Sequence, residues 1–251
     1  TFIGITIGYK SNFTYSVPNS VSNTFSNTAP WQYHNNSPIY FSSDFLYIVD
    51  GDPAIITGYT GTGATNGSLV IPDTVSGYRV TSIAANAFDN NTYVTAITLP
   101  SSMNKLSDGF LDNNENIANI YVDSANTSFK SVNGILYDYG GTILMRYPNG
   151  KTATSFTIPS GVTTIAYRAF ANNVTLTSVT FNSSLETIGA YAFDGCTSIS
   201  SYTFNSDVPT LTAYDTFNKD SLVYMYVPGT SLNNYRNDVY FKEYTSYLLS
   251  N

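Results

Sequence analysis

The chain repeats one pattern of residues in the adjoining segments FTIPSGVTTIAYRAFANNVTLTSV (residues 156–179) and VTFNSSLETIGAYAFDGCTSISSY (residues 179–202). The apolar positions coincide at a shift of 23 residues, so that Ile165 is repeated by Ile188 and Phe170 by Phe193. Self-similarity at a fixed period of about 20 to 50 residues is typical of stacked structural repeats. The sequence therefore predicts a β-rich solenoid with coils of about 23 residues.

Further copies extend this frame in both directions. Downstream, the frame continues through Leu211, Phe217 and Leu222. Upstream, LVIPDTVSGYRVTSIAANAFDNNTYVTAI carries the same pattern with a few inserted residues, and ITLPSSMNKLSDGFLDNNENIANI follows with Leu106 and Phe110 in register. Five copies are visible in the sequence.

Each copy contains two short strand-like stretches, which an Ala-Phe corner joins. One has the form L-x-x-V-x-F, as in Leu176, Val179 and Phe181, and its alternation points every second side chain inward. A unit this short cannot bury its apolar face alone, so strands of successive coils must pair in parallel, about 4.8 Å apart. We expect the corner rings to form one internal column of Phe88, Phe110, Phe170, Phe193 and Phe217.

The pattern I-P-x-x-V-x-x-I-x-x-x-A-F-x-x-C-x-x-L is similar to the BspA-like leucine-rich repeats of bacterial surface proteins. The resemblance covers residues 44–251, although the second copy has Gly109-Phe110 instead of Ala-Phe and only Cys196 keeps the cysteine of the pattern. It implies a right-handed superhelix with a parallel strand ladder. It also implies a secreted or cell-surface location and binding of host or matrix proteins or of other bacteria.

The ends of such a solenoid need caps, because terminal coils expose apolar edges. Residues 45–66 predict a β-hairpin N-cap around Asp50-Gly51-Asp52-Pro53. The near-helical spacing of apolar residues after Ser231 predicts a short helical C-cap; these residues are Leu232, Tyr235, Val239 and Tyr240.

Two segments fall outside the repeat frame. Residues 123–153 contain two β-rich runs around Gly140-Gly141, which predict a hairpin insertion within the repeat domain. Residues 1–43 predict a separate β-rich N-terminal segment of unknown type, with a strand in TFIGITIGY. We therefore expect two domains, 1–43 and 44–251.

Composition argues against several kinds of partner. The chain is 42% hydrophobic but only 11% charged, with a formal net charge of −7 and a pI near 4.4. Binding of nucleic acid needs clustered Lys and Arg, and the few present are scattered. No apolar run approaches the length that spans a bilayer, so we expect no membrane insertion. The chain begins at Thr1 without Met, which suggests a processed or excised form.

Catalytic and metal-binding residues are also sparse. His34 is the single histidine and Cys196 the single cysteine, so the usual dyads and zinc ligand sets cannot be completed. Cys196 occupies a repeat position that should be buried. Asp50 and Asp52 lack the further oxygen ligands of a calcium loop, which favours a turn. We therefore expect no enzyme activity, no cofactor and no metal site.

The solvent face of the strand ladder is the remaining candidate site. Aligned copies place two rows outward: Thr98, Tyr121, Thr157, Thr180, Thr203 and Tyr226 in one, and Thr95, Thr154, Thr177 and Ser200 in the other, with Tyr224 on the same ladder. Thr is a favourable residue on exposed strands, which is one interpretation. The other is that an uncharged, hydroxyl-lined face with tyrosines stacks and hydrogen-bonds with a protein or glycan.

These observations leave several functions open. The first is an adhesin-like module on the cell surface that binds a protein or glycan of a host or neighbouring cell. The second is a structural spacer or self-assembling subunit whose partner is another copy of itself. The third is the non-catalytic, carbohydrate-binding part of a larger enzyme. Ice binding through the threonine rows and hydrolysis are less well supported.

Overall fold

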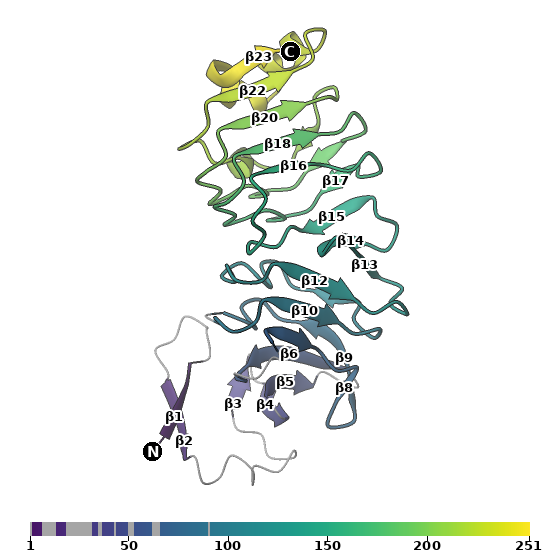
Figure 1. Ribbon diagram of the computed structural model, residues 1–251, viewed down its shortest axis with the longest axis vertical. Coiled ribbons are helices and arrows are strands. Elements are labelled where there is room, and N and C mark those ends of the chain that lie inside the picture. Colours follow the sequence, from purple (N-terminus) through teal and green to yellow (C-terminus); the bar gives the residue numbers. More distant parts are fainter. Residues whose placement is uncertain are drawn as a thin grey trace. The chain divides into compact units, whose positions relative to one another are not determined.

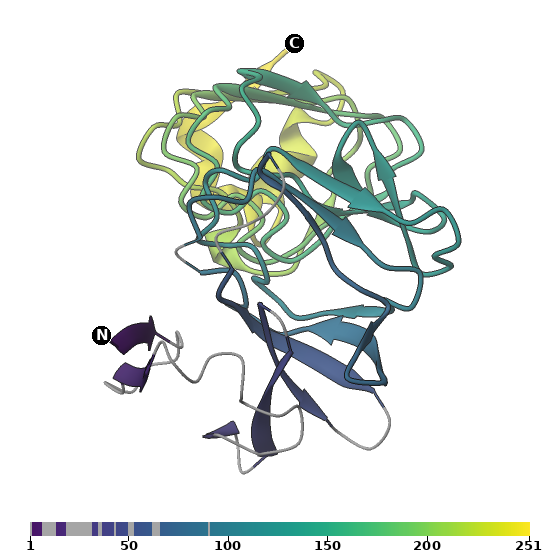
Figure 2. The same cartoon turned by 60° about the horizontal axis from the view of Figure 1, so that its bottom comes forward.

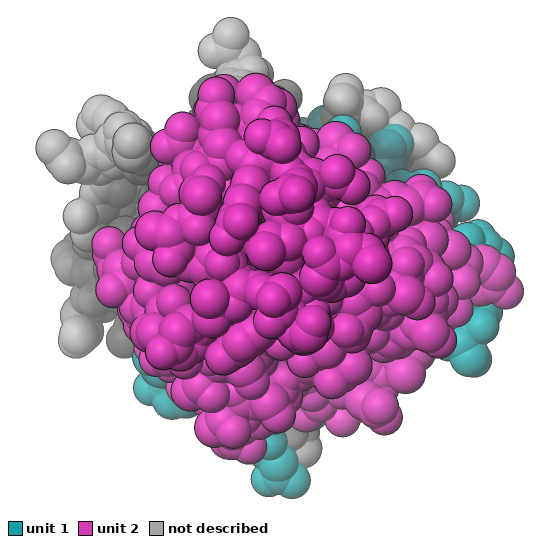
Figure 3. Space-filling model, turned by 90° about the horizontal axis from the view of Figure 1, so that it is seen from above, with its two compact units in different colours: residues 1–114, 122–127 teal, residues 115–121, 128–251 magenta. Residues whose placement is uncertain are grey.

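The computed structural model of the chain describes residues 2–6, 14–18, 32–34, 37–42, 44–49, 53–61, 66–89 and 91–251. Within the described residues the fold is a β-solenoid with coils of about 23 residues, parallel strands and few helices. Contacts divide the chain into two compact units, coloured in Figure 3. Unit 1 comprises residues 1–114 and 122–127, and unit 2 comprises residues 115–121 and 128–251.

Unit 1 contains the predicted N-terminal hairpin (Figure 2). Its strands are β1 (Phe2–Thr6), β2 (Thr14–Pro18), β3 (Gln32–His34), β4 (Ser37–Ser42), β5 (Phe45–Val49), β6 (Ala54–Tyr59), β7 (Ser68–Val70), β8 (Thr74–Val75), β9 (Tyr78–Ile83), β10 (Ala96–Leu99) and β11 (Lys105–Leu106). Strands β5 and β6 pair antiparallel, as the sequence predicts, and β4 extends this sheet antiparallel on the other side of β5. Parallel pairing begins where β6 meets β9. Asp50 and Asp52 lie outside the described residues.

Unit 2 contains two sheets of parallel strands from successive coils (Figure 1). Its strands are β13 (Phe129–Val132), β14 (Ile135–Asp138), β15 (Ile143–Arg146), β16 (Ser155–Thr157), β17 (Thr164–Ile165), β18 (Ser178–Phe181), β19 (Thr187–Ile188), β20 (Ser201–Phe204), β21 (Thr210–Leu211), β22 (Tyr224–Val227) and β23 (Leu248–Ser250), while β12 (Asn119–Val122) spans the boundary between the units. One sheet joins β15, β17, β19 and β21, and the other joins β16, β18, β20, β22 and β23. Residues 23 apart are paired, for example Thr157 with Thr180 and Thr180 with Thr203, which confirms the predicted register.

The corner phenylalanines of unit 2 form the expected internal stack. Phe170 and Phe193 lie with ring centroids 4.7 Å apart, and Phe193 and Phe217 with centroids 5.4 Å apart, each pair nearly parallel. Phe170 and Phe193 are fully buried. Phe88 and Phe110 are buried within unit 1, so the column is confirmed for three of its five predicted rings.

The corners turn tightly because one residue adopts a left-handed backbone. The residue before Ala-Phe has a positive φ at Asn86 (61°), Arg168 (53°) and Tyr191 (56°). Such a conformation costs a non-glycine residue roughly 1–2 kcal/mol, so the stacked core must compensate for it. The following alanines, Ala169 and Ala192, are fully buried, so a larger side chain would not fit there without displacing its neighbours.

In each unit, one asparagine side chain ties its coil to the coil before. In unit 2, Asn182 Nδ2 donates to the carbonyl oxygens of Pro159 and Val162, at 2.7 and 2.8 Å. In unit 1, Asn126 Nδ2 makes the equivalent pair of bonds to the carbonyls of Pro100 and Met103, both at 2.8 Å. These amides give the carbonyl groups of one turn hydrogen-bond donors from the next coil.

The insertion forms three antiparallel strands at one end of the sheet that continues through β17, β19 and β21. Strands β14 and β15 pair across Gly140-Gly141, as predicted. An additional strand, β13, pairs with β14 through a two-residue turn at Asn133-Gly134, whose φ angles of 52° and 74° belong to a type I′ hairpin turn. Strand β15 then pairs parallel with β17 and returns the chain to the repeat frame.

The C-terminal cap is helical but shorter than its apolar pattern suggests. The α-helix α1 (Leu232–Asn237) ends where the Asp238 side chain accepts hydrogen bonds from the backbone N–H groups of Tyr240 and Phe241. A 3-10 helix, η3 (Phe241–Tyr247), follows; a second one, η2 (Tyr214–Thr216), lies earlier in the chain. Because α1 stops early, Val239 is 51% exposed, and Tyr235, Phe241 and Tyr244 are the residues that the cap buries.

The stack predicts a large difference between inward and outward substitutions. Phe193→Ala should lower the free energy of unfolding by about 3–5 kcal/mol, because it leaves a cavity between two rings. Thr180→Ala, on the outer face of β18, should cost less than about 0.5 kcal/mol. Chemical denaturation of both variants measures the difference, and equal losses would contradict the register.

A second prediction concerns Tyr202, a buried residue whose hydroxyl has no hydrogen-bond partner among the described residues. Its ring packs on Phe193 and Phe217, and burial raises its pKa well above the ordinary value. Removing an unsatisfied buried hydroxyl relieves a cost of about 1–3 kcal/mol, so Tyr202→Phe should stabilise the chain.

Tyr244→Phe is the matched control for this measurement. The Tyr244 hydroxyl donates to the carbonyl oxygen of Tyr214 at 2.8 Å, so its removal should destabilise the chain by about 1 kcal/mol. Thermal and urea unfolding of both variants would show opposite signs. Destabilisation by Tyr202→Phe would contradict the assignment.

Candidate functional site

The outward residues of β16, β18, β20, β22 and β23 form one continuous surface in unit 2, which we call the strand face. Pairing aligns two outward rows: Ser155, Ser178, Ser201 and Tyr224 in the first, and Thr157, Thr180, Thr203, Tyr226 and Leu249 in the second. The residues between the rows point inward; Val179, Tyr202 and Met225 are buried. The strand face is therefore held by a packed core directly beneath it.

The strand face carries no charged side chain. Residues 154–157, 177–181, 200–204, 223–227 and 248–250 contain no Asp, Glu, Lys, Arg or His. Its polar groups are hydroxyls, each of which can donate one hydrogen bond and accept two. The surface thus offers hydrogen bonding without electrostatic attraction to an ionic partner.

Only one of these two rows coincides with a row expected from the sequence. Thr157, Thr180, Thr203 and Tyr226 share a row, as expected. The serine row at 155, 178 and 201 was missed, although the two-residue alternation of a strand places it on the same face.

The second predicted row has a structural role between coils. Thr177 Oγ1 donates to the carbonyl oxygen of Thr154 at 3.0 Å, and Ser200 Oγ to that of Thr177 at 3.3 Å. Thr95 does the same in unit 1, with the carbonyl oxygen of Gly67 at 3.2 Å. Each of these hydroxyls already donates its proton to a carbonyl oxygen, so it can only accept a hydrogen bond from a ligand.

Two further predicted residues lie on other strands. Thr98 is half-buried on β10 in unit 1, where it pairs with Val70. Tyr121 lies on β12 and is 46% exposed.

Tyrosines gather at two places on unit 2. On β22, Tyr224 is 45% exposed, and its ring lies beside that of Tyr226, with centroids 5.7 Å apart. At the corners, Tyr167 is 41% exposed and meets Tyr191 edge-on, with centroids 5.8 Å apart. The corner pair was not anticipated from the sequence, because Tyr191 takes a left-handed backbone that usually favours Gly or Asn.

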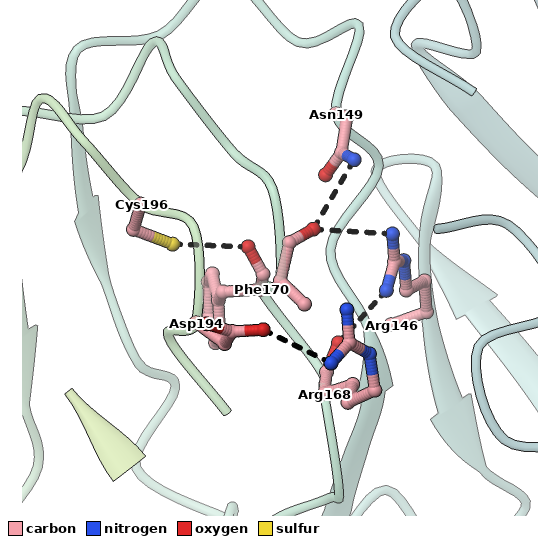
Figure 4. A network of polar contacts seen from close by, with 7 residues as sticks. Arg146, Asn149, Arg168, Phe170, Asp194 and Cys196 are labelled. Atoms are coloured by element: carbon pink, nitrogen blue, oxygen red, sulfur yellow. Dashed lines mark hydrogen bonds and ion pairs between the residues drawn. The ribbon is translucent and has the colours of Figure 1, made fainter. Parts of the chain in front are cut away.

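A buried polar cluster lies on the corner side of unit 2 and stabilises the turns (Figure 4). The Arg146 guanidinium is buried and donates to the carbonyl oxygens of Arg168 at 2.8 Å and Ala171 at 3.3 Å. Asn149 Nδ2 donates to the same Ala171 oxygen at 3.2 Å. The cluster supplies hydrogen-bond donors to the carbonyl oxygens of the corners and does not present a reactive group to solvent.

Cys196 belongs to this cluster and is fully buried, as the repeat frame predicts (Figure 4). Its Sγ donates to the Phe170 carbonyl oxygen at 3.1 Å, and burial raises the pKa of the thiol to about 12. Arg168 forms an ion pair with Asp194 at 3.0 Å, and both side chains are partly exposed. Within the described residues, no three His, Cys, Asp or Glu side chains come together as a metal site. The His34 side chain lies outside them.

The family is shown by the repeat model that the chain matches. Residues 66–133 and 147–247 match the BspA type leucine-rich repeat region in six copies, one more than the five visible by eye. The chain therefore belongs to this family, whose members are typically bacterial surface proteins. The match lies within the predicted repeat domain, while the predicted boundary at residue 43 stays a prediction. No curated protein matches the chain.

Solved structures of bacterial leucine-rich repeat proteins are similar to this chain. A leucine-rich repeat protein from Eubacterium ventriosum is 19% identical, with a TM-score of 0.43 over 75% of this chain and 77% of that one. One from Bacteroides ovatus is 20% identical, with a TM-score of 0.45 over 77% and 56%. The pneumococcal vaccine antigen PcpA is 13% identical, with a TM-score of 0.39 over 86% and 99%.

The surroundings of Cys196 predict an unreactive thiol. A pKa of about 12 instead of 9 leaves about a thousandfold less thiolate at neutral pH, and the sulfur is also inaccessible. Native protein treated with iodoacetamide at pH 8 should remain unmodified in the mass spectrum, whereas unfolded protein should gain one adduct. Rapid labelling of the native chain would contradict the burial of Cys196.

Proposed function

We propose that the chain is a secreted or cell-surface binding module that recognises a protein or glycan on a host or neighbouring cell and has no catalytic role. The continuous, uncharged strand face over five paired strands is the observation that carries this proposal. It is regular, rigidly supported and polar without being ionic. Membership of a family of bacterial surface proteins supports the proposed location.

The proposed contact residues follow the rows of the strand face. They are Thr157, Thr180, Thr203, Tyr224 and Tyr226, with Thr154 and Thr177 at the strand starts. Tyr121 on β12, and separately Thr98 on β10 of unit 1, are further proposed contacts. Binding here needs no cofactor or metal. Among the described residues, no helix has both the length and the apolar character to cross a membrane.

Self-association is a second candidate, and the position of β23 favours it. This strand is the last in the order of its sheet, and Leu249 on it is 41% exposed. Such an edge can pair with a strand of another copy. Light scattering over a concentration series distinguishes the two functions, since a persistent monomer supports the binding module and disfavours assembly.

The proposed function predicts that a charge on the strand face abolishes recognition. A multimerised chain screened on arrays of extracellular proteins and glycans should find a saturable partner, and Thr180→Glu should weaken binding at least about tenfold, because the carboxylate must be desolvated. Dissociation constants from biolayer interferometry measure the effect.

Thr187→Glu is the matched control, because Thr187 is half-buried like Thr180 but lies on β19 of the other sheet. It should leave the affinity unchanged. Equal losses in both variants, or no saturable partner for the multimerised chain, would contradict recognition through the strand face.

A further inference from the structure

Two tyrosines end the hydroxyl rows of the strand face on β22. Tyr224 follows Ser201 in the first row, and Tyr226 follows Thr203 in the second. Being two residues apart on one strand, both rings stand on the outer face, where their planes are inclined by 37°. They form an open aromatic platform, which we call the tyrosine platform.

Polar side chains border the tyrosine platform on one side and an apolar side chain borders it on the other. Toward β20 lie the hydroxyls of Ser201 and Thr203. Toward β23, Leu249 pairs with Tyr226 and is 41% exposed. A ligand that covers the rings thus meets hydrogen-bonding groups on one side and an apolar side chain on the other.

The platform is held in place before any ligand arrives. Strand β22 is paired on both edges, by β20 and β23, and the intervening Met225 and Val227 are fully buried. Among the described residues, neither tyrosine hydroxyl is engaged in a hydrogen bond. A rigid site of this kind loses little conformational entropy on binding.

The absence of charge selects the class of ligand. Complementary charges steer and orient many protein partners as they approach a binding surface. No charged side chain lies on any of the five strands. A neutral sugar chain fits better, because its C–H faces pack on aromatic rings while its hydroxyls exchange hydrogen bonds with Ser and Thr.

We infer that the tyrosine platform binds a neutral oligosaccharide, which stacks on Tyr224 and Tyr226 and continues along the rows toward Thr203 and Thr180. The inference rests on the proposed function and specifies the ligand class of the same surface. It requires no covalent step, metal or second subunit.

Affinity electrophoresis in native gels tests this inference with four soluble neutral polysaccharides: dextran, barley β-glucan, galactomannan and yeast mannan. At least one should retard the full chain. Tyr224→Ala should weaken that retardation at least about tenfold, since it removes one of the two rings on which the sugar stacks. Tyr224→Phe, which keeps the ring, should retain most of it.

Tyr139→Ala is the matched control, because Tyr139 is 58% exposed and lies on the hairpin insertion. It should behave as the unmodified chain. Circular dichroism spectra identical among the variants would assign any loss to the ring rather than to unfolding.

The outcomes distinguish failure of the ligand inference from failure of the proposed function. Retardation that depends on Tyr224 but not on Tyr139 supports the inference. If none of the polysaccharides binds while a protein partner from the array depends on Thr180, the inference fails and the proposed function stands. If retardation persists in Tyr224→Ala, the tyrosine platform is not the site and the inference also fails.

Discussion

The stacking of one coil on the next governs this structure, because no single coil has enough apolar surface to form a core. In unit 2 three successive coils each contribute one corner phenylalanine, and the rings of Phe170, Phe193 and Phe217 complete one another's burial. Parallel pairing in a register of 23 residues follows, since any slip would move the rings out of contact. The left-handed corners at Arg168 and Tyr191 are maintained by the same packing.

Stacking also separates the residues that hold the fold from those available for binding. Inward positions such as Val179 and Met225 are committed to the core, and hydroxyls such as that of Thr177 are committed to the preceding coil. The outward side chains of the strands neither pack in the core nor bond to the preceding coil. On the strand face these positions are Ser, Thr and Tyr, except for Leu249, and they are therefore the residues that can determine which partner binds.

The sequence was sufficient for the repeat period, the inward residues, the N-terminal hairpin and the burial of Cys196, because periodic apolar residues report burial directly. It was insufficient where a single polar residue redirects the backbone. Asp238 ends α1, where its carboxylate accepts hydrogen bonds from the N–H groups of Tyr240 and Phe241. Asn133-Gly134 starts an additional hairpin, which its turn signal could have revealed. On the surface, alignment by residue identity hid the serine row, which depends on strand alternation.

The identical spacing of the coils has a consequence for any long ligand. A chain-like molecule lying along the rows meets the same Ser and Thr pair again after each coil, so placements displaced by one coil make equivalent contacts. Such a ligand can shift along the surface by one coil and keep equivalent contacts. At β22 the Ser and Thr pair is replaced by two tyrosines. A ligand that stacks on these two rings is therefore held at one defined position along the rows.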